Sequence, residues 1–394
     1  MSMTGKERVN IAMRLGEPDR VPVFCQLSIG HYFLNASADP FDIWFRAEVF
    51  AEALMELQNR YRFDGILVNL PGRDPAFEQF VEKVDNVGKE QTVRWKNGCF
   101  TTIPNDDNPH YFQADGSRYF PTFEEIDPEV LWYVEPWDIT EITYPYTWGF
   151  DQTARPDSDF FPSYHSDPIK AVKERVGEEV SVHSEVFSPF SQFLELLNYE
   201  NALMALLDDP GKVHACLDRL ASGAVDLARR QAQAGADAVL ISSAFAGSGL
   251  ISREHYSEFV APYEKRIVDE TKERYDITVY THTCGGIGDR LDLMLQTGTQ
   301  GIDTLDPPPL GTVELADAVT QLKGKAFIKG NIDPVNTLLY GNDTTVEEAV
   351  LERLRLAMRG GGYILSSACS VAPGVRPELL QRLTELAEAH GRYA

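Results

Sequence analysis

Short hydrophobic runs alternate with longer amphipathic segments along most of the chain. Eight of these runs have the length and boundaries of strands: residues 21–25, 65–70, 179–184, 238–242, 277–281, 301–305, 326–329 and 362–365. The segments between them show the period of helices, most clearly residues 42–60, 211–233, 253–273, 288–295, 313–322, 346–358 and 377–390. Pro262 lies within the third of these helices and predicts that it kinks or splits. Eight strand–helix units favour an α/β fold, the (β/α)8 or TIM barrel.

An open, doubly wound sheet is the alternative arrangement for the same alternation. Residues 247–252, Gly-Ser-Gly-Leu-Ile-Ser, come near a dinucleotide-binding fingerprint but lack its third glycine. The incomplete motif weakens the open sheet more than it supports it.

The alternation breaks between residues 88 and 165, after the second strand unit. Asn97-Gly98 predicts a hairpin turn, because both residues tolerate a positive φ. Proline and aromatic residues are dense further on, at residues 132–137 and 144–148. We predict one barrel domain over residues 1–394 that carries residues 88–165 as an aromatic-rich insertion. Three roles for the insertion are open. It is a lid, part of a substrate pocket, or a segment packed for stability or dimerisation.

Composition and charge narrow the classes of function. The 394 residues carry a formal net charge of −24 and show no basic patch, so we expect no nucleic-acid partner. No run approaches about 18 apolar residues, so we expect no membrane span. The first residues lack the apolar region of a signal peptide, and the five cysteines have no regular spacing. These features predict a cytoplasmic protein.

Candidate chemistry lies where the predicted strands end. In a barrel, the carboxyl ends of all strands meet at one face, and active sites form there. The polar residues at those positions are Glu185, Ser243, His282, Cys284, Asp306, Asn331, Asp333 and Cys369. His282 and Cys284 are two residues apart on one strand end, so their side chains share a face.

One imidazole and two thiols suit a tetrahedral zinc site. Zn²⁺ accepts both ligand types, and a catalytic site keeps one position exchangeable. We therefore predict His282, Cys284 and Cys369 as metal ligands. The alternative is that the two cysteines are small buried apolar residues. Glu185 and Asp306 are candidates for a fourth ligand, an acid–base group or a supporting role, and Asn331 completes the candidate catalytic set.

Four stretches together resemble a known family. They are residues 7–23, with Glu7-Arg8-Val9 and Asp19-Arg20-Val21-Pro22-Val23; His282-x-Cys284-Gly285; residues 330–334, Gly-Asn-Ile-Asp-Pro; and residues 361–365, Gly-Gly-Tyr-Ile-Leu, followed by Cys369. This set resembles the uroporphyrinogen decarboxylase superfamily, in particular its zinc-dependent methyltransferase branch.

The resemblance implies a (β/α)8 barrel with zinc held by His282, Cys284 and Cys369. It also implies methyl exchange between a small substrate (a methyl ether, a methylamine-type compound or a thiol) and the cobalt of a corrinoid protein. The chain has no D-x-H-x-x-G corrinoid motif, so cobalamin would be carried by a separate partner. A homodimer is a further possibility.

Two other functions remain open. The decarboxylases of the same superfamily need no metal and hold the substrate carboxylates with arginines near the first strand. Residues 24–33 contain no arginine here, which counts against a polycarboxylate substrate. A binding protein that has kept the barrel without catalysis is the third possibility.

Overall fold

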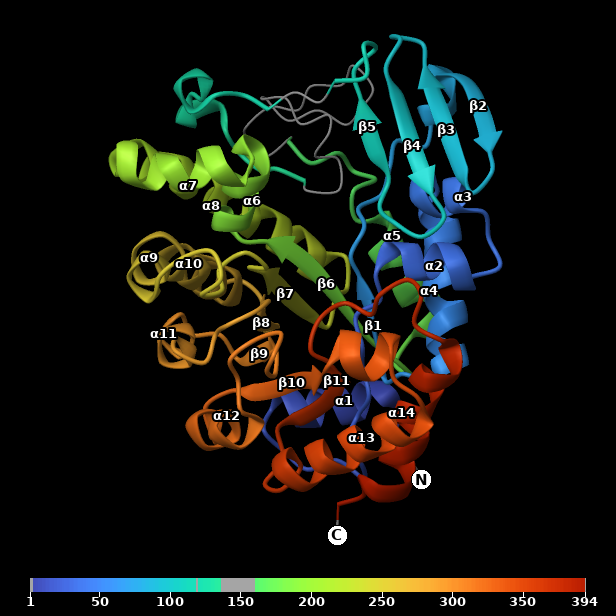
Figure 1. Cartoon of the computed structure of the whole chain (residues 1–394), viewed down its shortest axis with the longest axis vertical. Coiled ribbons are helices and arrows are strands. Elements are labelled where there is room, and N and C mark those ends of the chain that lie inside the picture. The colour runs from blue at the N-terminus through green and yellow to red at the C-terminus, as the bar shows by residue number, and fades with distance from the viewer. Residues whose placement is uncertain (1–2, 118–119, 136–159, 394) are drawn as a thin grey trace.

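The structure is a computed structural model that describes residues 3–117, 120–135 and 160–393. Its centre is a curled, parallel sheet of seven strands in the order β1-β6-β7-β8-β9-β10-β11 (Figure 1). The strands are β1 (Gly65–Val68), β6 (Ser181–Phe187), β7 (Ala238–Ser242), β8 (Thr278–Thr283), β9 (Gly301–Thr304), β10 (Phe327–Ile332) and β11 (Tyr363–Ser367). Spatial order follows chain order without a reversal. This excludes the open doubly wound sheet, which reverses at a switch point.

The predicted first strand, residues 21–25, is not a regular strand. It forms isolated parallel bridges instead, Val23 with Leu365 and Leu27 with Val371, and the Asp64 amide donates to the Val23 carbonyl. The segment therefore lies between β11 and β1, where an eighth strand would close the sheet. Two local features prevent a regular ladder. Pro22 has no N–H, and the Val23 N–H is taken by the Asp64 carboxylate at 2.8 Å. The prediction of eight strands is corrected to seven within a TIM-like fold.

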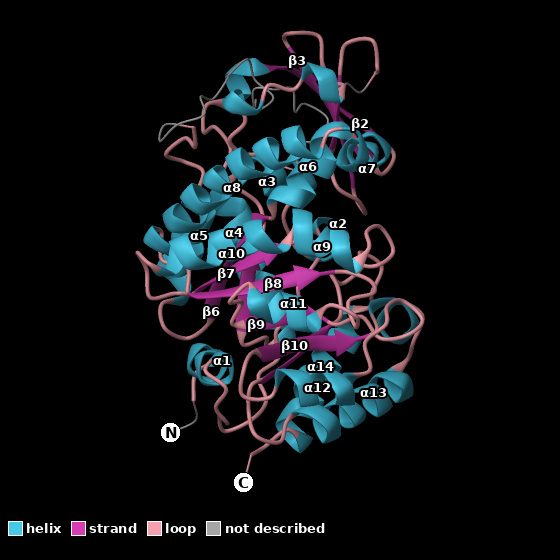
Figure 2. Cartoon of the chain, turned by 90° about the vertical axis from the view of Figure 1, so that its left-hand side faces the viewer, coloured by secondary structure: helices cyan, strands magenta, loops and turns pink. Residues whose placement is uncertain are grey.

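Helices surround the sheet, and most of them cover its outside (Figure 2), whereas the first of them packs against its interior. They are α1 (Gly5–Met13), α2 (Ile29–Asn35), α3 (Pro40–Phe45), α4 (Ala47–Tyr61), α5 (Asp167–Val176), α6 (Pro189–Leu197), α7 (Tyr199–Asp208), α8 (Pro210–Gln233), α9 (Arg253–Phe259), α10 (Ala261–Lys272), α11 (Leu291–Gln296), α12 (Leu315–Leu322), α13 (Asp343–Ala357) and α14 (Pro377–His390). The predicted helix over residues 253–273 is split into α9 and α10, with Pro262 in the first turn of α10. In the described part of the chain, no helix is long and apolar enough to cross a bilayer.

The inside of the curled sheet is filled by a separate hydrophobic cluster. Phe24, Leu67, Leu240, Tyr280 and Phe327 are among its members, and α1 packs against it. Side chains two residues apart on a strand share a face. Asn69 therefore follows Leu67 on the inner face, and His282 follows Tyr280, both one step nearer the carboxyl ends. The apolar inner layer thus gives way to polar residues towards that end.

The segment between β1 and β6 contains a second sheet. It is antiparallel, in the order β2-β3-β4-β5, with β2 (Val81–Val87), β3 (Glu90–Trp95), β4 (Phe100–Pro104) and β5 (His110–Phe112). The predicted Asn97-Gly98 hairpin joins β3 to β4, and Gly98 has a φ of +90°. The sheet begins at Val81, earlier than the predicted boundary at residue 88. Trp137 and the aromatic residues 144–148 lie outside the described residues, and the role of the insertion stays a prediction.

Candidate metal centre

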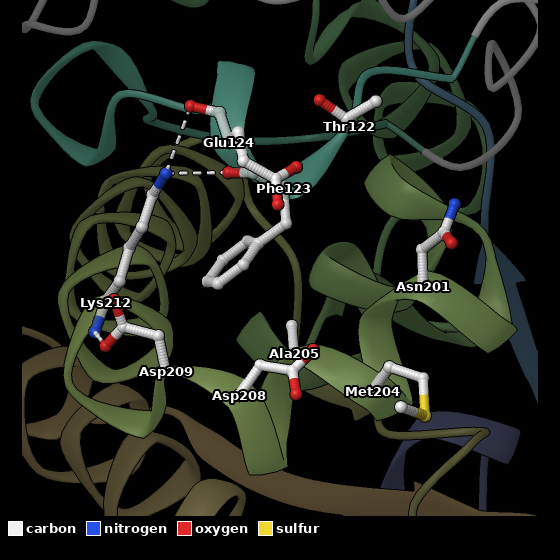
Figure 3. Close-up of a pocket in the computed structure, with 9 residues that line it drawn as sticks. All are labelled: Thr122, Phe123, Glu124, Asn201, Met204, Ala205, Asp208, Asp209 and Lys212. Atoms are coloured by element: carbon white, nitrogen blue, oxygen red, sulfur yellow. Dashed lines mark hydrogen bonds between the residues drawn. The ribbon is translucent and has the colours of Figure 1, made fainter.

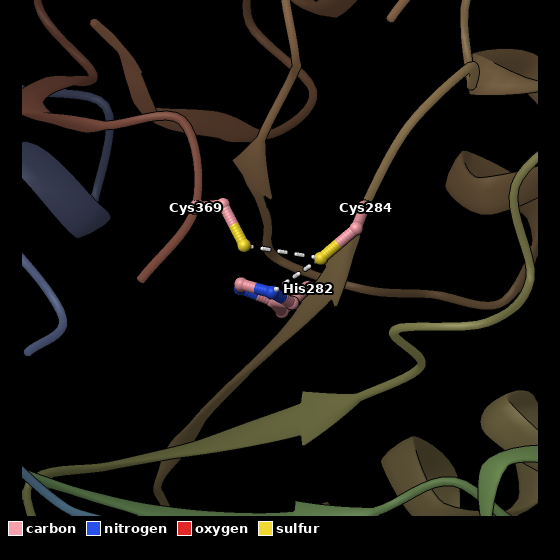
Figure 4. A group of neighbouring side chains, drawn as sticks. All are labelled: His282, Cys284 and Cys369. Carbon is pink, nitrogen blue, oxygen red and sulfur yellow. Dashed lines mark hydrogen bonds between the residues drawn. The ribbon is translucent and has the colours of Figure 1, made fainter. Parts of the chain in front are cut away.

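Three side chains converge at the carboxyl end of the seven-stranded sheet (Figure 4). His282 and Cys284 come from the end of β8, and Cys369 comes from the loop after β11. The Nε2 atom of His282 lies 3.2 Å from the Sγ of Cys284, and that sulfur lies 3.3 Å from the Sγ of Cys369. One ligand atom from each residue falls within 4.8 Å of the others. Residues 85 positions apart are thus brought to one point, as the strand-end argument predicts.

The loops around the cluster depend on two glycines. Gly285, directly after Cys284, has a φ of +76°, a conformation that residues with a Cβ rarely adopt. Gly247 packs against the Cys284 carbonyl, and a Cβ at residue 247 would lie 2.4 Å from that oxygen. Gly247 and Gly249 therefore belong to a loop that packs beside Cys284, and not to a dinucleotide-binding turn.

Two charged residues behind His282 were missed in the sequence. Asp303 on β9 lies 3.1 Å from the Nδ1 atom of His282, and Lys329 on β10 lies 3.0 Å from both carboxylate oxygens of Asp303. The side chains of Asp303 and Lys329 are 2% and 1% exposed. The imidazole therefore donates from Nδ1 to Asp303, and its Nε2 faces the two sulfurs. The sequence carried one signal of this pair, a charged residue within each of two otherwise mainly apolar strands.

The electrostatics of the cluster favour charge separation. Burial opposes a charged His282, but Asp303 and Cys369 more than offset it and raise the pKa of His282 to about 10. The hydrogen bond from Cys284 and the neighbouring His282 lower the pKa of the Cys369 thiol well below its ordinary value. Together, these shifts favour an imidazolium beside a thiolate at neutral pH.

The donor set fits a zinc ion. Imidazole nitrogen and thiolate sulfur are its usual protein ligands, and a carboxylate behind the histidine is the common support that fixes the ring. No other His, Cys, Asp or Glu of the described residues joins the group within 4.8 Å. Three ligands of this kind would leave one of the four positions of zinc for a substrate or a fourth ligand.

The three predicted catalytic residues lie around this cluster without belonging to it. Asp306 accepts the Gly285 N–H at 2.6 Å, and burial raises its pKa to about 6. Asn331 donates to the Leu305 carbonyl at 2.8 Å, while its Oδ1 has no partner in the described part of the chain. Glu185 is 7% exposed, and burial raises its pKa to about 7. All three lie at the same end of the sheet.

The remaining cysteines and the buried His183 do not belong to the cluster. Cys25, Cys99 and Cys216 are buried free thiols away from the cluster. His183 lies inside the sheet, between the Ser181 hydroxyl at 3.0 Å and the Tyr280 hydroxyl at 2.8 Å. It is therefore a hydrogen-bonded residue of the interior.

An open groove of about 450 Å³ lies between residues 122–124 and helices α7 and α8 (Figure 3). One wall is fixed by Lys212, which donates to the carbonyls of Phe123 and Glu124 at 2.6 and 3.3 Å. None of the predicted site residues lines it.

Comparisons with known proteins place the chain in a family. The model of the family described as uroporphyrinogen decarboxylase (URO-D) matches residues 145–390. The methylcobamide:CoM methyltransferase MtbA of Methanosarcina acetivorans is 30% identical over 220 residues, which cover 56% of this chain and 61% of that protein. A uroporphyrinogen decarboxylase of Prochlorococcus marinus is 28% identical over 239 residues, which cover 58% of this chain and 64% of that protein. These alignments span less than two thirds of the relatives' own lengths.

The fold has a close counterpart among solved structures. A methyltransferase from Methanosarcina mazei aligns over 98% of this chain and 99% of its own, with a TM-score of 0.69 and 17% sequence identity. At that identity the likeness concerns the fold. The family model, in contrast, matches well over half of the sequence, and the chain belongs to the uroporphyrinogen decarboxylase (URO-D) family.

Proposed function

We propose that this chain is a zinc-dependent methyltransferase that moves a methyl group between a small substrate and a corrinoid protein. The observation that carries the proposal is the group of His282, Cys284 and Cys369, with Asp303 behind the imidazole. A uroporphyrinogen-type decarboxylation needs no such group. The 30% identity to a methylcobamide:CoM methyltransferase supports the same direction.

The residues of the chain would hold the metal in a defined orientation. Asp303 keeps one proton of His282 on Nδ1, so Nε2, once a metal has displaced its own proton, would direct its lone pair towards the two sulfurs. Lys329 neutralises Asp303 and keeps the carboxylate in place. Asp306 restrains the backbone just after Cys284 by accepting the Gly285 N–H. Zn²⁺, when bound, supplies a Lewis acid that favours the thiolate form of a thiol or polarises an ether oxygen.

Glu185, Asp306 and Asn331 are proposed to act on the substrate. The pKa values of Glu185 and Asp306, raised by burial to about 7 and 6, suit proton transfer near neutral pH. Asn331 offers a free carbonyl oxygen at the same end of the sheet.

Two directions of transfer are compatible with this site. The chain could demethylate an aryl methyl ether or a methylamine-type compound, or it could pass methyl from the corrinoid to a thiol such as coenzyme M. In either direction the cobalamin is proposed to arrive on a partner protein.

Metal-free decarboxylation is the second candidate function. The observation in its favour is that uroporphyrinogen decarboxylases match the chain nearly as well as the methyltransferases do, at 28% against 30% identity. The two activities differ in their dependence on metal.

The direct test is methyl transfer from methylcobalamin to coenzyme M, followed by the change in cobalamin absorbance. The same preparation is assayed for carbon dioxide release from uroporphyrinogen. Methyl transfer that requires zinc supports the proposal. Decarboxylation that persists after treatment with a chelator, without methyl transfer, would replace it with the second function.

A further inference from the structure

A small pocket lies at the carboxyl ends of β1 and β6, under α5 and α8. Its polar lining comes from five buried residues: Asn69, Glu135, His165, Glu185 and Gln231. Val68, Leu70, Ile169 and Leu227 supply apolar walls. We call this the β1–β6 pocket. Its volume is about 20 Å³, which accommodates about one group the size of a water molecule.

Three oxygen atoms in this lining have no hydrogen-bond partner among the described residues. They are Asn69 Oδ1, Glu185 Oε2 and Gln231 Oε1, on side chains that are 6%, 7% and 5% exposed. The orientation of Gln231 is fixed, because its Nε2 donates to the Glu185 carbonyl at 2.7 Å. A buried polar atom without a partner costs about 1–3 kcal/mol, so three such atoms around one cavity mark a place where a bound hydrogen-bond donor would be stabilised.

The chemistry of the lining selects a hydrogen-bond donor. Carbonyl and carboxylate oxygens accept hydrogen bonds. Two lining residues, Glu135 and Glu185, are acidic, and none is lysine or arginine. His165 stays neutral near pH 7, because burial and the charges of Arg73 and Arg230 lower its pKa to about 3. An anionic group would therefore find no cation in this lining.

The position of the pocket sets the size of the ligand. Glu185 is on β6 and His282 is on β8, with β7 between them. Neighbouring strands are about 4.8 Å apart, so roughly 10 Å separates the two strands. A molecule with one end in the pocket and a methyl group at the metal centre must therefore be several bonds long. Methanol and methylamine are too short.

We propose that the β1–β6 pocket binds the hydrogen-bond-donating head group, an ammonium or a hydroxyl, of a methylated substrate whose methyl group lies at the opposite end. This inference rests on the proposed function for the identity of the ligand as substrate. The head group donates to Gln231, Asn69 and Glu185, and the methyl-bearing end reaches towards His282.

Binding of three para-substituted probes to the full-length protein tests the pocket without turnover. 4-Methoxybenzylamine offers an ammonium, 4-methoxyphenol offers a hydroxyl, and 1,4-dimethoxybenzene offers no donor. Dissociation constants come from saturation-transfer difference NMR. We expect one or both donor probes to bind and the third to bind at least tenfold more weakly. The donor probe with the lower dissociation constant identifies the preferred head group as an ammonium or a hydroxyl.

Variants locate the binding. Gln231→Met should weaken the donor probe about tenfold, the loss expected for one hydrogen bond to a charged or buried partner. Gln233→Met, an exposed position on the same helix, is the matched control and should leave binding unchanged. Asn69→Leu replaces Gln231→Met if that variant does not fold.

Two results would overturn the inference: no binding of either donor probe, or unchanged binding in the folded pocket variant. Probe binding through Gln231 without any methyl transfer would instead contradict the proposed function and leave the pocket in place. Methyl transfer by a protein that binds neither probe would overturn the pocket inference and leave the proposed function in place.

Discussion

Asp303 lies 3.1 Å from the Nδ1 atom of His282, on the side of the ring opposite Cys284. The carboxylate is buried and paired with Lys329. A histidine held in this way has one tautomer and one ring orientation, so its second nitrogen is prepared to bind a metal before any metal arrives. Asp303 and His282 thus give the cluster the fixed geometry that a metal site needs.

Asp303→Asn should weaken zinc binding by about 10- to 100-fold, because a neutral amide orients the imidazole less firmly and does not enhance its basicity. Zinc affinity is measured by competition with a chromophoric chelator. Asp317→Asn, an exposed change on α12, serves as the control. An affinity equal to that of the control would show that Asp303 does not position His282.

Lys329→Met should lower the free energy of unfolding by about 3–5 kcal/mol, because it removes one of the two cationic partners of the buried Asp303 carboxylate and leaves only His282. Urea unfolding followed by circular dichroism measures the loss. The double variant Asp303→Asn with Lys329→Met should recover part of this loss, since the under-compensated carboxylate charge is then gone. A loss below about 1 kcal/mol in the single variant would contradict the view that the pair is electrostatically coupled.

His31 should make the protein less stable in mild acid. Burial lowers the pKa of His31 to about 4, against 6.5 for an exposed histidine, although the Ala372 and Pro373 carbonyls favour its charged form. Above pH 6.5 the ring is neutral in both the folded and unfolded chains. Between pH 6.5 and 4 the unfolded chain binds the proton first, so stability falls as pH falls. The full effect is about 3 kcal/mol.

The difference between wild type and His31→Gln isolates this contribution. Unfolding free energies are measured at several values from pH 7 to pH 4. We expect the variant to lose about 3 kcal/mol less than wild type over that range, whatever its stability at pH 7. Parallel curves would mean that His31 titrates normally in the folded protein.

The sequence predicted much of the fold and the three side chains that meet at the carboxyl end of the sheet. The helix and strand periods located the seven strands, and Pro262 located the division between α9 and α10. The resemblance to the uroporphyrinogen decarboxylase superfamily is confirmed by the family model. His282, Cys284 and Cys369 were brought together by a single rule, that strand ends share one face of a barrel.

The errors have physical causes. Residues 21–25 have a strand-like pattern, but hydropathy does not show that a remote carboxylate, Asp64, takes the Val23 N–H. Asp303 and Lys329 lie within strands, where only the curvature of the sheet shows that they face His282. The unpartnered oxygens of the β1–β6 pocket depend on tertiary contacts with α8, and no sequence pattern marks them.

Zinc content tests the central claim most directly. The full-length protein is purified without chelator or a histidine tag, and elemental mass spectrometry is applied to wild type and to the Cys284→Ser, Cys369→Ser and Cys99→Ser variants. We predict about one zinc per chain in wild type and in Cys99→Ser, and none in the other two, with all four proteins folded. Full zinc in both site variants, or no zinc in wild type after zinc is supplied, would contradict the proposed metal centre.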